Sequence, residues 1–573
     1  CGVHADGSPD KSAQGGCNCG DSGYRRGWWE NLSFVQPDGN TTVHCATPAD
    51  VLSHFKASPL NMHFGAIRKP RTYSNLPLSQ KNGWLLPNVS DVGEGGNINW
   101  NFSVPSLRAW YAETHAHFVR DGIDFWWNDE GETSWDTYLR WNEAQASIQR
   151  ATKPNTRHFT LNRAWQPGMQ RFPAAAWTGD GQSCTHEELL RATLHGCPLI
   201  SCDLTSPDAT TLVRQYQSAV FTPLMRVHMM QGTPRVPWFW PNDANAPDYD
   251  AHQRAFRAAL QLRYTFLPFL YSLAHTAYRT GRPIAHPASF AFPDECSKGE
   301  GGEGDGGEGG DGDRSGSGDG GGGAAERCRL AEAAYMVGGV LAPANLGLAH
   351  TNTRPPPLEN VSTTYLAPLP GGARWFRWNS TAALDGGQTV RQTLALEEVA
   401  LYVRGGAILP LHGGGDVQRA AELGGTLEVQ VYSGADGEFI LSEDDGASLD
   451  YQGGVQDGGQ GGGGGGAAVR TTTWRWDDTA RTLSWSVAGG AQLDRDAPTL
   501  YSEVVVALFA PGAAAPVRVS ARITQILNVG RPMNTFRCAF DLTLEWEDRT
   551  FAPVLENAVP FARVDWARHW RPK

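Results

Sequence analysis

The chain has 573 residues, too many for one hydrophobic core, since single cores stop growing at about 250–300 residues. Its formal net charge of −12 argues against nucleic acid and anionic membranes as partners, because both require a basic footprint. No run of 18 apolar residues is present, so the sequence predicts no membrane span. Its 21 tryptophans, 22 phenylalanines and 15 tyrosines supply a large core and faces suited to stacking on sugar rings.

The ten cysteines show no metal-ligand spacing, so they indicate no metal site. Six Asn-X-Ser/Thr sequons lean toward the secretory pathway, although so short a motif leaves the localisation open. The sequons are at Asn31, Asn40, Asn88, Asn101, Asn360 and Asn379. The sequence does not indicate an oligomeric state.

Residues 1–46 are expected to be low in complexity and poorly ordered. Strand and helix signals then alternate over residues 47–282, which predicts a parallel α/β barrel. The predicted strands are 62–67, 123–128, 158–163, 172–177, 197–202 and 221–227. The predicted helices begin at Pro48, at Pro105 (ending at Gly122), at a capping box on Thr185, and at Tyr249 (running to Arg279 and stopped by Gly281).

Short strands with turn glycines dominate from Tyr335 onward, which predicts all-β domains. We expect a proximal β-domain at 283–413 and a distal β-sandwich at 414–573. Residues 296–328 are rich in Gly, Asp and Glu and are predicted to be a disordered insertion, as is the glycine-rich run 453–466. The spacing of Cys296 and Cys328 does not decide whether they pair.

The stretch Gly122–Glu132, GIDFWWNDEGE, is the strongest candidate for catalysis. A short apolar strand is followed at once by Asp129, Glu130 and Glu132, and Gly131 is expected to allow the turn. Carboxylates at the carboxyl end of a strand are expected at the mouth of an α/β barrel. Taken alone, an acidic turn after an apolar strand is more often a solvated loop or a helix N-cap than a catalytic site.

The order of the motifs resembles glycoside hydrolase family 31, which contains α-glucosidases and α-xylosidases. The resemblance covers about residues 47–485. It rests on NFSVPSLRAWYAE, GIDFWWNDEGE, LNR, QRFPAAAWTGD, CPLISCD and LMRVH in the barrel, and on YMVGGVLAPA, YVRGGAILPL and GEFILSEDDGASLDY beyond it. Family members have an N-terminal β-sandwich and the first barrel strands ahead of this region of resemblance. We find no signals for them before residue 47, so we expect an incomplete barrel.

The resemblance implies that Asp129 is the nucleophile of a retaining mechanism, that Glu132 supports it, and that Asp180 is the acid/base. It also implies that Arg163, Trp177, Asp203 and His228 hold the sugar. Neighbouring strand residues face opposite ways, so Trp126 and Trp127 divide between the two faces, and we assign Trp126 to sugar binding.

Each assignment has a structural alternative. The alternative for Arg163 is a simple ion pair with Asp129 or Asp203. The alternative for Asp203 is a helix cap, and the alternative for His228 is a histidine of the core.

The resemblance therefore implies an exo-acting α-glycosidase that releases terminal α-linked glucose and uses no metal or cofactor. The alternatives are an α-xylosidase or α-transglucosylase, or a catalytically inactive carbohydrate-binding relative or fragment. Glu130-Gly131 replaces the Met-Asn of most eukaryotic α-glucosidases, which leaves the sugar open.

Overall fold

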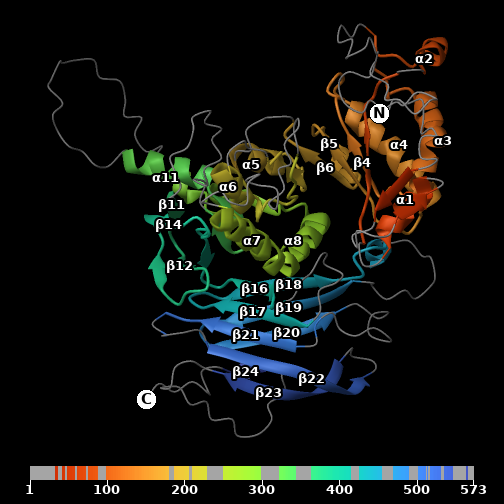
Figure 1. Cartoon of the computed structure of the whole chain (residues 1–573). Helices are drawn as coiled ribbons and strands as arrows, with labels where there is room; N and C mark the ends of the chain where they lie inside the picture. The colour runs from red at the N-terminus through yellow and green to blue at the C-terminus, as the bar shows by residue number, and fades with distance from the viewer. Residues whose placement is uncertain are drawn as a thin grey trace, which may run out of the picture. The chain divides into compact units, whose positions relative to one another are not determined.

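In a computed structural model, the chain divides into two compact units (Figure 1). The first comprises Cys1–Asp180 and Leu199–Ser201, and the second comprises Gly181–Pro198 and Cys202–Lys573. The structure describes residues 32–35, 42–45, 48–57, 61–72, 75–87, 99–179, 186–204, 209–228, 249–297, 322–342, 363–414, 425–454, 469–488, 501, 503–511, 513, 517–530, 535–545 and 563–565.

The first unit is built on a parallel sheet with the strand order β3-β4-β5-β6-β7. These strands are β3 (Gly65–Arg68), β4 (Phe125–Asn128), β5 (Phe159–Asn162), β6 (Ala174–Trp177) and β7 (Ile200–Ser201). Its described helices are α1 (Pro48–Lys56), α2 (Leu76–Asn82), α3 (Pro105–Asp121) and α4 (Thr137–Thr152). An antiparallel pair, β1 (Leu32–Val35) and β2 (Thr42–Cys45), precedes them. Parallel strands joined through helices agree with the predicted barrel architecture.

Helix α3 shows how local sequence sets an element. Pro105 lies in its first turn, where its missing N–H costs no hydrogen bond. Gly122 follows its end with a φ of 124°, a conformation that L side chains rarely adopt. Its buried face consists of Leu107, Tyr111, His115, Phe118 and Val119. Leu107, Tyr111, Phe118 and Val119 of this face pack into the core of the first unit, and both predicted ends of the helix are confirmed.

The second unit contains helices and four antiparallel or mixed sheets. Its helices are α5 (His186–Leu194), α6 (Ala209–Ala219), α7 (Tyr249–Thr265), α8 (Leu267–Thr280), α9 (Ala288–Ala291), α10 (Asp294–Ser297) and α11 (Gly322–Ala333). Its strands are β8 (Ala285–Pro287), β9 (Tyr335–Val337), β10 (Val340–Ala342), β11 (Thr363–Leu369), β12 (Arg374–Arg377), β13 (Ala383–Asp385), β14 (Gln388–Leu394), β15 (Tyr402–Arg404), β16 (Ile408–His412), β17 (Thr426–Tyr432), β18 (Gly437–Glu443), β19 (Arg470–Asp477), β20 (Thr482–Ala488), β21 (Glu503–Phe509), β22 (Val517–Gly530), β23 (Thr535–Glu545) and β24 (Arg563–Asp565).

The sheets of the second unit have the orders β13-β12-β15-β10-β9-β8, β11-β14, β16-β17-β21-β22-β23 and β18-β19-β20-β24. Strands β17 and β21 pair in parallel, and the other pairs in these sheets are antiparallel. The predicted all-β character beyond Tyr335 is confirmed for the described residues. The segment LYVRGGAILPL supplies two strands in different sheets, β15 and β16, because Gly406 turns the chain between them with a φ of 87°.

Three predictions of secondary structure were wrong in detail. The helix predicted from Tyr249 to Arg279 is two helices, since Pro268 lies at the start of α8 and cannot donate a backbone hydrogen bond within a helix. The strand predicted at 221–227 is a turn with one bridge, Leu204 to Val227. The end of the predicted disordered insertion, Gly322 to Cys328, belongs to α11, where Ala324, Ala325 and Glu326 are good helix formers.

Within residues 1–46, which were predicted to be poorly ordered, Leu32–Val35 and Thr42–Cys45 form the antiparallel pair β1 and β2. The remaining predictions on order lie outside the described residues. They concern residues 1–31, 298–321 and 455–468, together with the capping role of Thr185. The predicted domain limits at 46, 282 and 413 stay predictions. No helix among the described residues has the length and apolar character needed to cross a bilayer.

Candidate active site

Asp129 lies one residue beyond the end of β4, at the carboxyl edge of the parallel sheet. Its backbone N–H donates to the carbonyl of Arg68 at the end of β3, with an N···O distance of 2.8 Å. On the other side of β4, the N–H of Arg163 donates to the carbonyl of Asn128 at 3.0 Å. The three adjacent strand ends are therefore hydrogen-bonded in register, and this places Asp129 and Arg163 at one edge.

Residue Asp129 is 8 % exposed, and its carboxylate has two cations beside it. Arg163 Nη1 lies 3.1 Å from Oδ1, and Lys69 Nζ lies 3.8 Å from Oδ2. Arg163 Nε is also 3.3 Å from Oε1 of Glu132, so one guanidinium connects the two carboxylates. Opposite charges at these distances favour the ionised carboxylate that a nucleophile requires.

Burial raises the pKa of Glu132 from its ordinary value, against the lowering effects of Arg163 and of a hydrogen bond with Tyr138. The Tyr138 hydroxyl also accepts the N–H of Gly131 at 2.8 Å, and its pKa is raised, mainly by burial. Glu132 is thus linked to Asp129 through Arg163 and to α4 through Tyr138, consistent with a supporting role.

The turn between Asp129 and Glu132 differs from the prediction. The left-handed backbone conformation falls on Glu130, whose φ is 54°, and not on Gly131. Glu130 is held by Lys69 Nζ at 2.7 Å and by an ion pair with Arg71, and these two contacts offset the cost of the conformation. Gly131 is required for another reason: a Cβ there would lie 2.9 Å from Cζ of Tyr138.

The two tryptophans of β4 face opposite sides of the sheet, as predicted, and the one that faces the helices is Trp126, the residue predicted to bind the sugar. Trp126 packs edge-on against Phe118 of α3 and belongs to the core cluster formed with the helices. Trp127 instead meets Trp177 of β6, with ring centroids 5.9 Å apart. We therefore replace Trp126 by Trp127 in the candidate site, beside Trp177.

Asp203 and His228 belong to the second unit and form a cluster around Arg226. Asp203 is fully buried and pairs with Arg226, which also lies 3.1 Å from Nδ1 of His228 through Nη2. Asp203 comes two residues after β7 and His228 comes one residue after the Leu204–Val227 bridge. The structure thus brings these two predicted residues together. Asp180 lies outside the described residues.

Sequence reasoning passed over four residues of these clusters: Lys69, Arg71, Trp127 and Arg226. Each carried a signal. Lys69 and Arg71 follow a predicted strand, Trp127 is the alternative to Trp126, and Arg226 lies inside LMRVH. What the sequence lacked was the partner of each side chain.

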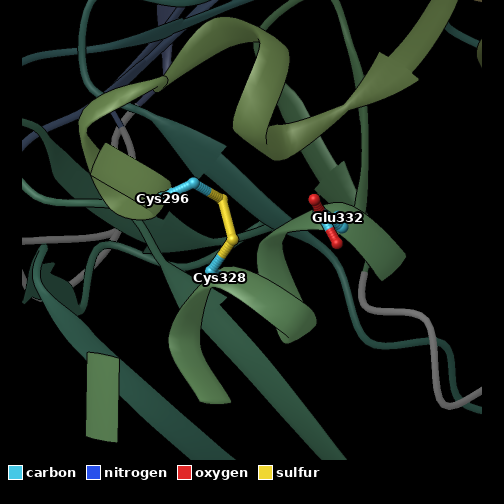
Figure 2. A group of neighbouring side chains, drawn as sticks. All are labelled: Cys296, Cys328 and Glu332. Atoms are coloured by element: carbon cyan, nitrogen blue, oxygen red, sulfur yellow. A yellow bond between two sulfur atoms is a disulfide. The ribbon is translucent and has the colours of Figure 1, made fainter. Parts of the chain in front are cut away.

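One described group of three potential metal ligands lies elsewhere, at Cys296, Cys328 and Glu332 (Figure 2). The two sulfur atoms are bonded to each other as a disulfide, so they do not offer the thiolates that bind metals. This group is a cross-link between α10 and α11.

Comparison with known proteins identifies the barrel region. Residues 46–273 match the family model for the glycosyl hydrolases family 31 TIM-barrel domain. This region of the chain belongs to glycoside hydrolase family 31. The resemblance stated from the motifs and the predicted α/β barrel with β-domains behind it are both confirmed.

Two curated relatives illustrate the range of the family. Neutral alpha-glucosidase C of Homo sapiens is 26 % identical over 353 residues, covering 54 % of this chain and 33 % of that protein. An alpha-xylosidase of Saccharolobus solfataricus is 28 % identical over 317 residues, covering 52 % and 36 %. The chain therefore spans about a third of the length of such relatives.

Solved structures show the same fold. The alpha-xylosidase of Xanthomonas citri superposes with a TM-score of 0.59 at 19 % identity, covering 83 % of this chain and 52 % of that one. The glucosidase II alpha subunit gives 0.60 at 18 % identity, covering 87 % and 54 %.

Proposed function

We propose that this chain carries the catalytic centre of a retaining, exo-acting α-glycosidase that removes terminal α-linked glucose. The observation that supports this most directly is the placement of Asp129. It is a nearly buried carboxylate, ion-paired on both sides, at the carboxyl edge of a family 31 barrel sheet. Curated relatives named as alpha-glucosidases and alpha-xylosidases support the reaction type.

In this mechanism an Asp129 oxygen attacks the anomeric carbon while Asp180 protonates the departing glycosidic oxygen. A water molecule then gives its proton to Asp180 and attacks the glycosyl ester, which restores both carboxyl groups and retains the configuration. Arg163 holds Oδ1 of Asp129 in place, and Trp127 and Trp177 offer an aromatic wall. In the second unit, Asp203, Arg226 and His228 form a separate polar cluster, in which the resemblance assigns Asp203 and His228 to sugar binding.

The test is covalent trapping with a 5-fluoro-α-glucosyl fluoride followed by peptide mass spectrometry. Labelling is expected on the peptide that carries Asp129, and at Asp129 itself. Asp129→Asn should lower kcat/KM on an aryl α-glucoside by about 10,000-fold, as expected for loss of a nucleophile. Glu132→Gln serves as the matched carboxylate control. A label on Glu132 would overturn the assignment.

Asp180 is tested by the leaving group. Asp180→Ala should slow hydrolysis of natural glycosides far more than hydrolysis of substrates with activated leaving groups, which need no protonation. Azide should rescue the variant and yield an α-glycosyl azide. Equal losses on both substrate types would remove Asp180 from the acid/base role.

The second candidate is an α-xylosidase of the same mechanism, favoured by the likeness to the Saccharolobus solfataricus and Xanthomonas citri enzymes. Aryl α-xylosides assayed beside aryl α-glucosides decide between the two by the ratio of kcat/KM.

A further inference from the structure

Three buried polar side chains form one face of α4. This helix lies beside β4 of the sheet that precedes Asp129 (Figure 1). Tyr138, Asn142 and Gln145 are spaced by four and three residues, so they lie on the same side of the helix. Each is 0 % exposed. Buried polar groups are costly unless they are hydrogen-bonded, so a row of three requires partners on the sheet.

Gln145 finds its partner at the end of β4. Its Nε2 donates to Oδ1 of Asn128 at 2.8 Å, and its Oε1 accepts from Asn128 Nδ2 at 2.8 Å. Asn128 immediately precedes Asp129, and its own carbonyl accepts the N–H of Arg163. This reciprocal amide pair therefore holds the residue through which Asp129 and Arg163 are joined.

Asn142 finds its partners on β5. Its Nδ2 donates to Oδ1 of Asn162 at 2.8 Å, and its Oδ1 accepts from the hydroxyl of Thr160. Asn162 immediately precedes Arg163, and its Nδ2 donates to the carbonyl of Ala175 on β6 at 3.0 Å. Asn128 Nδ2 also donates to Oδ1 of Asn162 at 2.9 Å, which closes the network between the two strand ends.

Tyr138 extends the same face to the catalytic loop, where its hydroxyl accepts the N–H of Gly131 and is hydrogen-bonded to Glu132. All three helix residues thus bond to positions within one residue of Asp129 or Arg163, or to the loop that follows Asp129. A satisfied polar network admits few alternative arrangements, whereas an apolar contact surface allows the helix to shift by small amounts.

We infer that the polar face of α4, formed by Tyr138, Asn142 and Gln145, positions Asp129 and Arg163 for the reaction through the carboxamides of Asn128 and Asn162. The inference rests on the proposed function of Asp129. These are positioning residues that do not touch the sugar. Displacement of a reacting group by about 1 Å can cost on the order of 100-fold in rate, so the network matters for rate beyond its contribution to stability.

The chain offers a matched control on the same helix. Gln149 is one turn beyond Gln145, is 2 % exposed, and its Nε2 has no hydrogen-bond partner among the described residues. Gln145→Leu and Gln149→Leu make the same chemical change at the same burial. Only the first removes a contact to a strand end.

The experiment measures kcat, KM and the thermal midpoint of the full chain and both variants on an aryl α-glucoside. Gln145→Leu should lower kcat by about 10- to 100-fold with KM changed less than threefold. Gln149→Leu should leave kcat within twofold of the unchanged chain. Equal losses of kcat in the two variants, or an unchanged kcat in Gln145→Leu, would overturn the inference and leave the network as a helix anchor.

A conservative variant adds a pH readout. In Gln145→Glu, a protonated carboxyl can donate to Oδ1 of Asn128 and accept from its Nδ2, so both hydrogen bonds return at low pH. Its kcat relative to the unchanged chain should recover on acidification and fall as the buried carboxyl ionises. A ratio that stays as low as that of Gln145→Leu at every pH contradicts the inference.

Hydrogen exchange separates this inference from the proposed function. Gln145→Leu should increase amide exchange in peptides covering 128–132 and 163, and Gln149→Leu should not. If the unchanged chain lacks glycosidase activity and this localised exchange is observed, the proposed function fails while the positioning contacts stand. Uniform exchange changes in both variants overturn the positioning role in either case.

Discussion

The parallel sheet of the first unit and the five-stranded sheet of the second unit bury different kinds of side chain. In the first unit, β4 and β5 bury Asn128, Thr160 and Asn162 against α4, and each is held by side-chain hydrogen bonds. In the five-stranded sheet of the second unit, the buried residues of β16 and β17 are mostly apolar, as in Ile408 and Val429. Apolar packing supplies stability and tolerates volume-conserving change, whereas a hydrogen-bonded amide network specifies position. We therefore expect the positions of side chains to be most tightly specified at the carboxyl edge of the parallel sheet, where Asp129 and Arg163 lie.

The largest expected effect is in the apolar sheet and concerns stability alone. Leu427 is 2 % exposed in the core of β17. Leu427→Ala should lower the free energy of unfolding by about 2–5 kcal/mol, because it loses apolar burial and leaves a cavity. Chemical denaturation measures this loss, and Leu427→Met is the volume-conserving control, with a cost under about 1.5 kcal/mol. At temperatures where Leu427→Ala is folded, its kcat should stay within twofold of that of the unchanged chain. A larger loss would show that the apolar sheet affects catalysis as well as stability.

The next effect is a pH dependence of the first unit. Burial, with a smaller contribution from Arg150, lowers the pKa of His158 to about 4. An unfolded chain binds a proton at this residue below a pH of about 6.5, and the folded chain does not. The contribution of His158 to the free energy of unfolding is therefore fully present above pH 6.5 and is lost as the pH falls toward 4. The total loss is about 3 kcal/mol at most.

Thermal midpoints between pH 7 and pH 4 measure this dependence, and His158→Asn should reduce the loss. Hydrogen exchange then shows where the acid acts, with β5 expected to lose protection before β17. An identical acid profile in the variant would show that His158 does not carry the effect.

The smallest effect is expected at Gly131. Gly131→Ala places a Cβ against the Tyr138 ring and should lower kcat about tenfold, since the turn after Asp129 must shift. Gly83→Ala is the control, because Gly83 has a φ of 67° and a Cβ added there would meet no heavy atom within 4 Å. That control should lose about 1 kcal/mol of stability from backbone strain without losing activity. If both variants keep their kcat, Tyr138 does not constrain the turn.

Local signals in the sequence predicted the elements well where one residue type sets the backbone. Pro105 and Gly122 bound α3, and Gly281 ends α8, because proline and glycine act through their own φ preferences. The same logic was missed at Pro268, where an apolar pattern continued on both sides of the break. Cys296 and Cys328 are 32 residues apart, and their pairing depends on how α10 and α11 pack, which no spacing reveals.

By itself, the sequence determined the family, the α/β barrel with β-domains behind it, and the acidic turn at Asp129, because motif order and periodicity are local properties of the chain. Only the tertiary structure decided which tryptophan of β4 faces Trp177, that Glu130 rather than Gly131 takes the left-handed conformation, and that Lys69, Arg71 and Arg163 surround the carboxylates. Those outcomes depend on which strands become neighbours. A side chain's partners across a parallel sheet come from segments tens of residues away, so their identity is a property of the fold.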